Sequence, residues 1–129
     1  MSAASWEDLT ARLRARLPGL QTMEVISLKA AGNRYTQLIQ RPTGLTLEAT
    51  ANEFLPPDGR LTPEQEKRLR DKGWLPPDPP GRNNWWYDID RLPLSDVDTA
   101  RVVDLMVCTL RDVYLVAGPA DVTERSFTV

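Results

Sequence analysis

Apolar residues near the start of the chain repeat at helical spacing. Ser5 has the character of an N-cap, and Asp8, three residues later, suits a capping box. Pro18 and Gly19 end the pattern. We therefore predict an amphipathic helix over residues 5–17, whose buried face carries Trp6, Leu9, Leu13 and Leu17.

Three short β-rich segments follow, at residues 23–28, 35–40 and 45–50. Turn-forming residues at 31–33 and 42–44 separate them. Because the connections are so short, consecutive strands should pair in antiparallel fashion. The pattern therefore predicts a three-stranded meander.

Two strand segments alternate between apolar and polar residues, as half-buried strands do. In the third segment the two faces are Leu45, Leu47 and Ala49 against Thr46, Glu48 and Thr50. A fourth strand is predicted over residues 85–90, with faces Trp85, Tyr87 and Ile89 against Trp86, Asp88 and Asp90. Successive side chains point to opposite faces, so we expect Trp85 in the core and Trp86 on the face open to water.

A second helix is marked by its caps. Thr62 and Gln65 fit a capping box, with Pro63 at the first helical position. Gly73 suits the residue after the helix, where a left-handed backbone would fold Trp74 back onto the last turn. We predict a short helix between these caps.

The longest predicted helix opens at Ser95 and runs to residue 117, before Gly118 and Pro119 stop it. Leu105 and Val116 fall outside its main apolar stripe on the helical wheel. They belong either to a second edge of the core or to a contact surface for another chain, and the sequence leaves both readings open. The main stripe consists of Val102, Val103, Met106, Val107, Leu110, Val113, Tyr114 and Ala117.

The element order is α-β-β-β-α-β-α, which predicts an α+β two-layer sandwich with an antiparallel sheet of about four strands. A short additional strand containing Val122 and Phe127 has only a weak pattern. We expect residues 1–129 to form a single domain, because 129 residues suffice for one core and are few for two.

Composition excludes several classes of chemistry. The chain has no histidine and one cysteine, Cys108, so it cannot form a Ser-His-Asp triad or a His/Cys zinc site. We therefore expect no metal and no cofactor. A net charge of -2 gives no drive toward nucleic acid or an anionic membrane. No signal peptide or membrane span is recognisable, so we expect a cytoplasmic protein.

Three other features have both a functional and a structural interpretation. Asp88 and Asp90 share a strand face and could bind a metal ion or act as an acid–base pair, but a solvated outer face is the favoured interpretation. The arginines at 12, 14 and 16 are interpreted as a solvated helix face. The proline-rich residues 76–80 could be a polyproline ligand, although a stiff linker packed on Trp74 and Trp85 is favoured.

Several segments together resemble a known family. They are Tyr35-Thr36-Gln37, the run from Leu47 to Leu55, Leu61-Thr62-Pro63-Glu64-Gln65-Glu66, Gly73-Trp74 with the following prolines, and Leu110-Arg111-Asp112-Val113-Tyr114. The chain resembles the actinobacterial TY-Chap group of the type III secretion chaperone and YbjN-like superfamily. That fold usually has a fifth strand before the last helix, and no such strand is recognisable between Asp90 and Ser95. The resemblance implies a non-enzymatic peptide- or protein-binding module, often dimeric.

We therefore predict a homodimeric chaperone or adaptor that binds a protein or peptide client, has no catalytic residues, and contacts its partner through Trp86, Leu105 and Val116. One alternative is an immunity or inhibitor protein with a single folded partner. The other is an enzyme that uses carboxylates alone.

Overall fold

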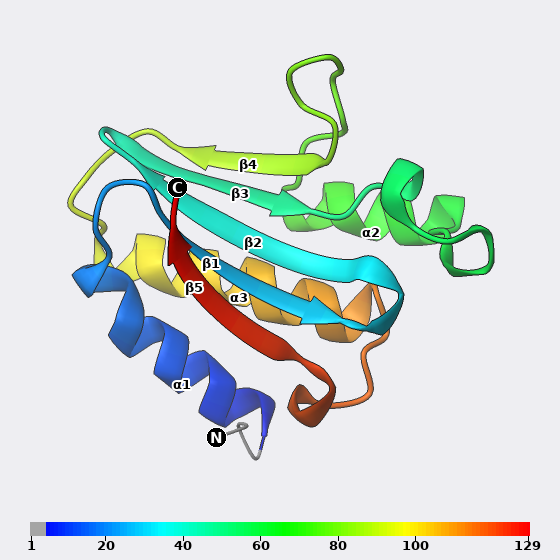
Figure 1. The fold of residues 1–129 in the computed structure, drawn as a ribbon, viewed down its shortest axis with the longest axis horizontal. Coiled ribbons are helices and arrows are strands. Elements are labelled where there is room, and N and C mark those ends of the chain that lie inside the picture. Colours follow the sequence, from blue (N-terminus) through cyan, green and yellow to red (C-terminus); the bar gives the residue numbers. More distant parts are fainter. Residues whose placement is uncertain (1–4) are drawn as a thin grey trace.

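Residues 5–129, which the computed structural model describes, form an antiparallel sheet backed by helices (Figure 1). The elements follow one another as α1 (Trp6–Arg16), β1 (Glu24–Ala30), β2 (Arg34–Arg41), β3 (Gly44–Ala49), α2 (Pro63–Lys72), β4 (Trp85–Ile89), α3 (Asp96–Asp112) and β5 (Thr123–Thr128). The α+β two-layer architecture expected from the sequence is confirmed.

The sheet has five strands in the order β4-β3-β2-β1-β5, rather than about four. The additional strand is β5, which follows α3 in the chain and pairs with β1. It was difficult to predict because neither face of this edge strand is buried in the main core. Glu124 and Ser126 meet α1 on one side, and the other side is exposed.

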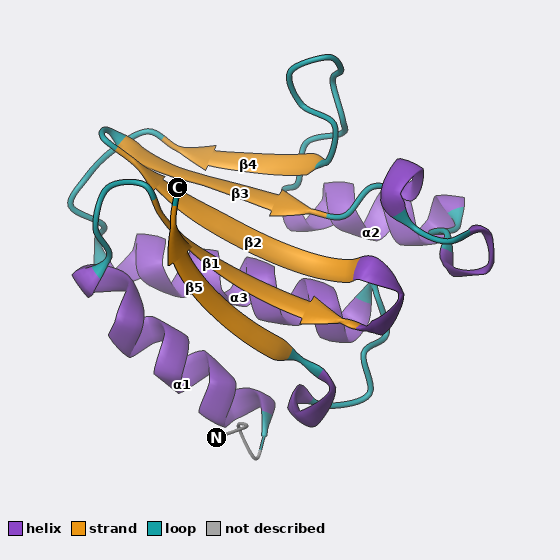
Figure 2. Cartoon of the chain, in the orientation of Figure 1, coloured by secondary structure: helices purple, strands orange, loops and turns teal. Residues whose placement is uncertain are grey.

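The helices cover a single face of the sheet. Figure 2 shows α3 behind the strands, α1 next to it along the β5 edge, and α2 beyond the end of β3. Alternate strand residues point into the layer between sheet and helices, where burial of apolar surface is the main stabilising contribution. Fully buried side chains from the three central strands include Ile26, Leu28, Leu38, Leu45 and Leu47.

The predicted helix caps are present. Ser5 accepts a hydrogen bond from the Asp8 backbone N–H, and both Thr62 and Ser95 form capping boxes. Gly73 has a φ of 111°, and the next residue donates its backbone N–H to the Leu69 carbonyl at 3.1 Å. The predicted reversal of the chain after α2 is therefore confirmed.

The end of α3 differs from the prediction. The helix stops at Asp112 instead of continuing to residue 117, and Leu115 adopts a left-handed backbone with a φ of 58°. The chain then folds back, so that the Val116 backbone N–H donates to the Leu110 carbonyl at 2.9 Å. Continuous apolar spacing through the turn concealed this reversal in the sequence.

No helix in residues 5–129 is long and apolar enough to cross a membrane. The cytoplasmic location and the single-domain organisation stay predictions from the sequence.

Candidate functional site

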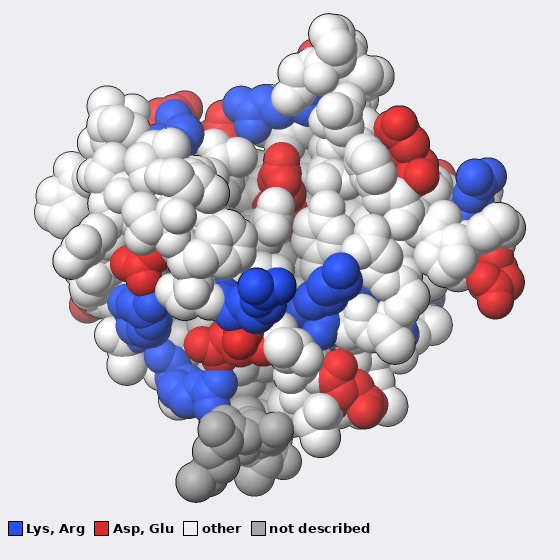
Figure 3. All heavy atoms as spheres, viewed as in Figure 1, with Lys and Arg blue, Asp and Glu red and all other residues white. Residues whose placement is uncertain are grey.

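The sheet face opposite the helices is uncovered. In Figure 1 the strands lie in front of α3, with α1 alongside β5, and Figure 3 shows the side chains of this open face from the same direction. Phe127 is 43% exposed here, and Val129, just beyond β5, is also exposed. Apolar side chains that stay exposed together are a common mark of a contact surface.

Two rows of side chains cross the open face from β5 to β4. The strand register defines the first row as Phe127, Val25, Ile39, Thr46 and Asp88. It defines the second row as Arg125, Ser27, Gln37, Glu48 and Trp86. In the first row the open face is therefore apolar toward β5. Toward β4 the face is polar apart from the ring of Trp86.

A hollow of about 310 Å³ lies where the two rows meet, and Figure 3 shows the middle of this face recessed, with acidic atoms in the recess. The Gln37 side-chain amide donates to the Glu48 carboxylate at 2.7 Å, which fixes the polar part of the lining. An apolar side chain could be buried in this hollow while polar groups beside it stay solvated. The lining residues are Val25, Gln37, Leu38, Ile39, Thr46, Glu48, Phe127 and Val129.

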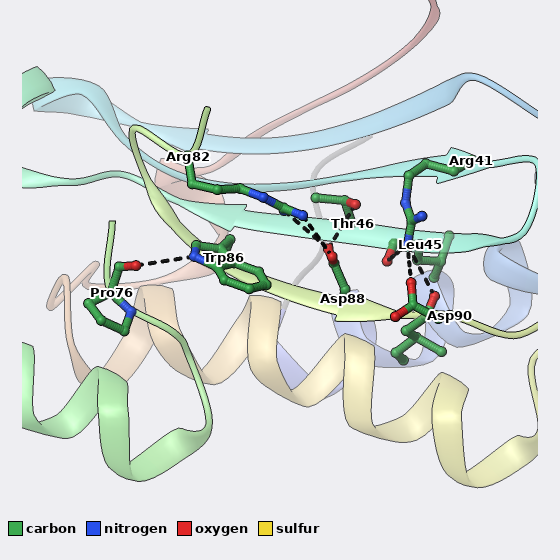
Figure 4. Close-up of polar contacts among 9 residues, drawn as sticks. Arg41, Leu45, Thr46, Pro76, Arg82, Trp86, Asp88 and Asp90 are labelled. Atoms are coloured by element: carbon green, nitrogen blue, oxygen red, sulfur yellow. Dashed lines mark hydrogen bonds and ion pairs between the residues drawn. The ribbon is translucent and has the colours of Figure 1, made fainter. Parts of the chain in front are cut away.

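Trp86 forms a rigid aromatic ridge at the β4 end of the open face (Figure 4). Its indole N–H donates to the Pro76 carbonyl at 3.1 Å, and the Arg82 guanidinium lies 4.2 Å from the ring centroid. Leu75 pairs with the Trp86 backbone through two hydrogen bonds of 2.8 and 3.1 Å, which cover part of the outer edge of β4. The ring is therefore held in place before any partner binds.

The Asp88 carboxylate is neutralised within this cluster. Arg82 donates two hydrogen bonds to it, at 2.8 and 3.2 Å, and the Thr46 hydroxyl donates a third at 2.9 Å. Burial raises the pKa of the Asp88 carboxyl, but the hydrogen bonds from Arg82 and Thr46 outweigh that effect, so its pKa lies below the ordinary value. Asp88 is thus a charged structural anchor that positions Arg82 over Trp86.

The neighbouring Asp90 pairs with a different arginine. Arg41 Nη2 donates to Asp90 at 2.8 Å and to the Leu45 carbonyl at 3.2 Å (Figure 4). Asp88 and Asp90 therefore do not converge on a common point, as an acid–base pair would require. Among the described residues, no group of three or more His, Cys, Asp or Glu side chains could hold a metal ion.

Two of the predicted partner-binding residues, Leu105 and Val116, were chosen because they lie outside the main apolar stripe of the last predicted helix. The structure shows that this position does not expose them. Leu105 and Val116 are each only 3% exposed and belong to the hydrophobic core. Leu105 lies on the same side of α3 as Thr109, whose hydroxyl accepts the Trp74 indole N–H at 2.9 Å, so the segment after α2 covers that side. Val116 lies beyond the end of the helix, and the helical wheel does not apply to it. Both residues form a second edge of the core.

The assignment of the two adjacent tryptophans is confirmed. Trp85 is 2% exposed and lies in the core, whereas Trp86 is half-buried on the opposite face. The proline segment was expected to pack on Trp74 and Trp85. Its Pro76 carbonyl accepts a hydrogen bond from the Trp86 indole, and Leu75 joins the edge of β4, while the packing on Trp74 and Trp85 stays a prediction. The partner-binding role of Trp86 stays a prediction.

Sequence reasoning missed the residues that make the hollow. Strand alternation placed Glu48 on the exposed face, but gave no reason to connect it with Ile39 or Phe127. The alternation of Phe127 with its neighbours was the available signal, and β5 is too polar for that signal to be strong.

A model of a known protein family matches nearly the whole chain. The family model described as T3SS (YopN, CesT) and YbjN peptide-binding chaperone 3, TY-Chap3, matches residues 2–128. This range includes every helix and strand of the described residues, and therefore the whole open face. Comparisons with curated proteins and with solved structures found no match.

Proposed function

The chain belongs to the TY-Chap3 family of peptide-binding chaperones, and from this premise we propose that it is a non-enzymatic chaperone or adaptor that binds an extended client segment across its open sheet face. The observation that carries the proposal is the uncovered hollow beside Phe127, with Val25 and Ile39 on its apolar side. An enzyme would need converging titratable groups in a cleft, and Asp88 and Asp90 of this face each pair with a separate arginine instead.

The shape of the face suits an extended peptide. Alternate side chains of an extended peptide point to the same side, about 6.7 Å apart, which matches the spacing of the two rows. One apolar side chain would enter the hollow, and the next side chain on that side would lie over Gln37 and Glu48. Trp86 would provide a flat aromatic contact at low entropic cost, because its ring is already fixed.

Two phenylalanines provide a matched test. Phe127 is 43% exposed and lines the hollow, whereas Phe54 is 40% exposed and lies outside it. We expect the wild-type protein to suppress aggregation of the reduced insulin B chain, a model unfolded client. Phe127→Ser should weaken this suppression severalfold, and Phe54→Ser should leave it unchanged. Equal effects of the two substitutions, or no suppression by the wild-type protein, would count against the proposal.

We also propose that the protein is a homodimer, but not through the outer side of α3, where Leu105 is buried. The free edge of β5 is the better candidate, because β5 pairs only with β1 among the described residues. Free edges readily pair with another strand. Antiparallel pairing of two copies centred on Ser126 would place Arg125 of one copy opposite Phe127 of the other, whereas centring on Arg125 would oppose like charges.

Light scattering at micromolar concentration should then give twice the 14.5 kDa chain mass. In a Cys108→Ser background, Ser126→Cys should form disulfide-linked dimers on oxidation, and the exposed control Phe54→Cys should not. A mass of 14.5 kDa would refute the dimer. A dimer in which Ser126→Cys does not cross-link would refute the β5 interface only.

A further inference from the structure

The hollow on the open face combines an apolar lining with one carboxylate that forms no ion pair within residues 5–129. Glu48 lines the hollow, and its side chain accepts a hydrogen bond from the neutral Gln37 amide. No ion pair among residues 5–129 includes Glu48. The two other carboxylates toward β4 on this face, Asp88 and Asp90, each have an arginine partner at 2.8 Å.

The cations nearest Glu48 are committed elsewhere or lie far across the sheet. Arg82 is held by two hydrogen bonds to Asp88 and lies over Trp86, which is opposite Glu48 in the register. Arg125 shares the row of Glu48 but lies on β5, three strands away, which is about 14 Å at ordinary strand spacing. Arg82 interacts with Glu48 only at longer range, so a positive charge placed over Glu48 would meet a carboxylate that has no ion-pair partner among residues 5–129.

We propose that this hollow selects client segments in which a bulky apolar side chain has a lysine or arginine two positions away. The proposal rests on the proposed function, because it requires the open face to bind a peptide. The apolar side chain enters the hollow between Ile39 and Phe127, in the first row of side chains. The neighbouring row contains Glu48, one same-face step of about 6.7 Å along an extended peptide. Glu48 lies on β3, one strand to the side of Ile39, and the long side chain of a lysine or arginine at that step can extend toward its carboxylate.

Arg125 gives the selection a direction across the sheet. It is exposed on β5, at the end of the row opposite Trp86, and Lys29 is exposed in the next row of β1. Among residues 5–129 neither cation forms an ion pair. They repel a client cation from the β5 side, so the basic residue is favoured over β3, where Glu48 lies.

The test uses fluorescence anisotropy with dye-labelled Gly/Ser dodecapeptides that differ at two positions. The apolar–basic pair is presented as Leu-Ser-Lys and as Lys-Ser-Leu, and compared with Leu-Ser-Gln, Leu-Ser-Glu and Ser-Ser-Lys. We expect the better of the two Leu/Lys orders to bind about fivefold more tightly than Leu-Ser-Glu, since one exposed charge pair supports a preference of that size. Raising the salt from 50 mM to 500 mM should reduce the preference, because exposed charges are screened.

Three variants identify the carboxylate that is responsible. Glu48→Gln can keep the hydrogen bond with Gln37, and it should remove the preference for lysine over glutamate while Leu peptides still bind. Glu48→Lys should reverse the preference. Glu53→Gln changes the net charge equally at an exposed position outside the hollow, and it should leave the preference intact.

The outcomes separate this inference from the proposed function. The Leu peptides could bind better than Ser-Ser-Lys without any preference for lysine over glutamate, or with a preference that survives Glu48→Gln. Either result overturns the inference and leaves peptide binding by the open face standing. A preference that Glu53→Gln removes as fully as Glu48→Gln reflects net charge and also overturns the inference. Failure of every Leu peptide to bind overturns both.

Discussion

The adjacent tryptophans of β4 should respond very differently to truncation, since they lie on opposite faces of the sheet. Trp85 is 2% exposed, and Trp85→Ala would leave a large cavity between sheet and helices. Replacing a buried Trp with Ala costs about 3–5 kcal/mol. This is a large part of the total stability of a small domain, which is about 5–15 kcal/mol.

Trp86→Ala removes smaller interactions. The indole hydrogen bond to the Pro76 carbonyl contributes about 1 kcal/mol, and the contact with the Arg82 guanidinium about 0.5–1 kcal/mol at a partly exposed site. The ring is only half-buried, so little cavity remains. We therefore expect a loss of about 1–2 kcal/mol in the free energy of unfolding, smaller than the loss of about 3–5 kcal/mol for Trp85→Ala.

Urea melts followed by far-ultraviolet circular dichroism measure both losses without depending on tryptophan emission. The insulin B chain assay then tests function, and Trp86→Ala should reduce suppression of aggregation although the variant remains folded. Trp86→Phe is the control, since it keeps a ring beneath Arg82 and loses only the indole N–H. A Trp86→Ala loss equal to that of Trp85→Ala would refute the energetic reasoning. Unchanged suppression would remove Trp86 from the client-binding face.

The remaining predictions concern the framework of the sheet. Gly44→Ala should destabilise the protein by several kcal/mol in urea melts, because an added Cβ would lie 1.9 Å from the Ile89 carbonyl oxygen. Thr109→Val should cost about 1–3 kcal/mol, since the buried Trp74 indole N–H would lose its acceptor. Asp88 has a lowered pKa when folded, so its contribution to stability is complete above about pH 4 and is lost as the pH falls through the folded pKa. Melts at pH 7 and pH 3 should therefore show a smaller acid loss for Asp88→Asn than for the wild-type protein.

Features that depend on local sequence were predictable. Each helix N-cap is a contact between residues three apart, as between Thr62 and Gln65, so the sequence contains the whole interaction. Strand alternation is equally local, and it assigned Trp85 and Trp86 to the correct faces. The backbone reversal at Gly73 followed from the residue type that a left-handed conformation favours.

Features that depend on tertiary neighbours were not predictable in this way. Leu105 was placed outside the main apolar stripe because the wheel of α3 was read against one sheet alone, which left open whether it belongs to the core or to a contact surface. The structure adds a second cover on that side, where the Trp74 indole reaches Thr109. Val116 was assigned to the helix, with the same two readings open, because its apolar spacing continues past the left-handed turn at Leu115. In both cases the apolar spacing was identified correctly, but the elements that pack against these residues could not be inferred from it.

The apolar part of the candidate site depends on the most distant pairing in the sheet. β5, near the end of the sequence, pairs with β1, near its beginning. The hydrogen bond between Ser126 and Glu24 joins residues that are 102 positions apart. This register places Phe127 opposite Val25 on the open face. A slip of one residue would turn Phe127 toward α1 and would place Ser126 or Thr128 beside the hollow. The interactions of Ser126 with Arg16 and Glu24 oppose such a slip, because they require Ser126 to face α1. The polar contacts beneath β5 therefore determine whether the open face has an apolar hollow, although none of their residues lines it.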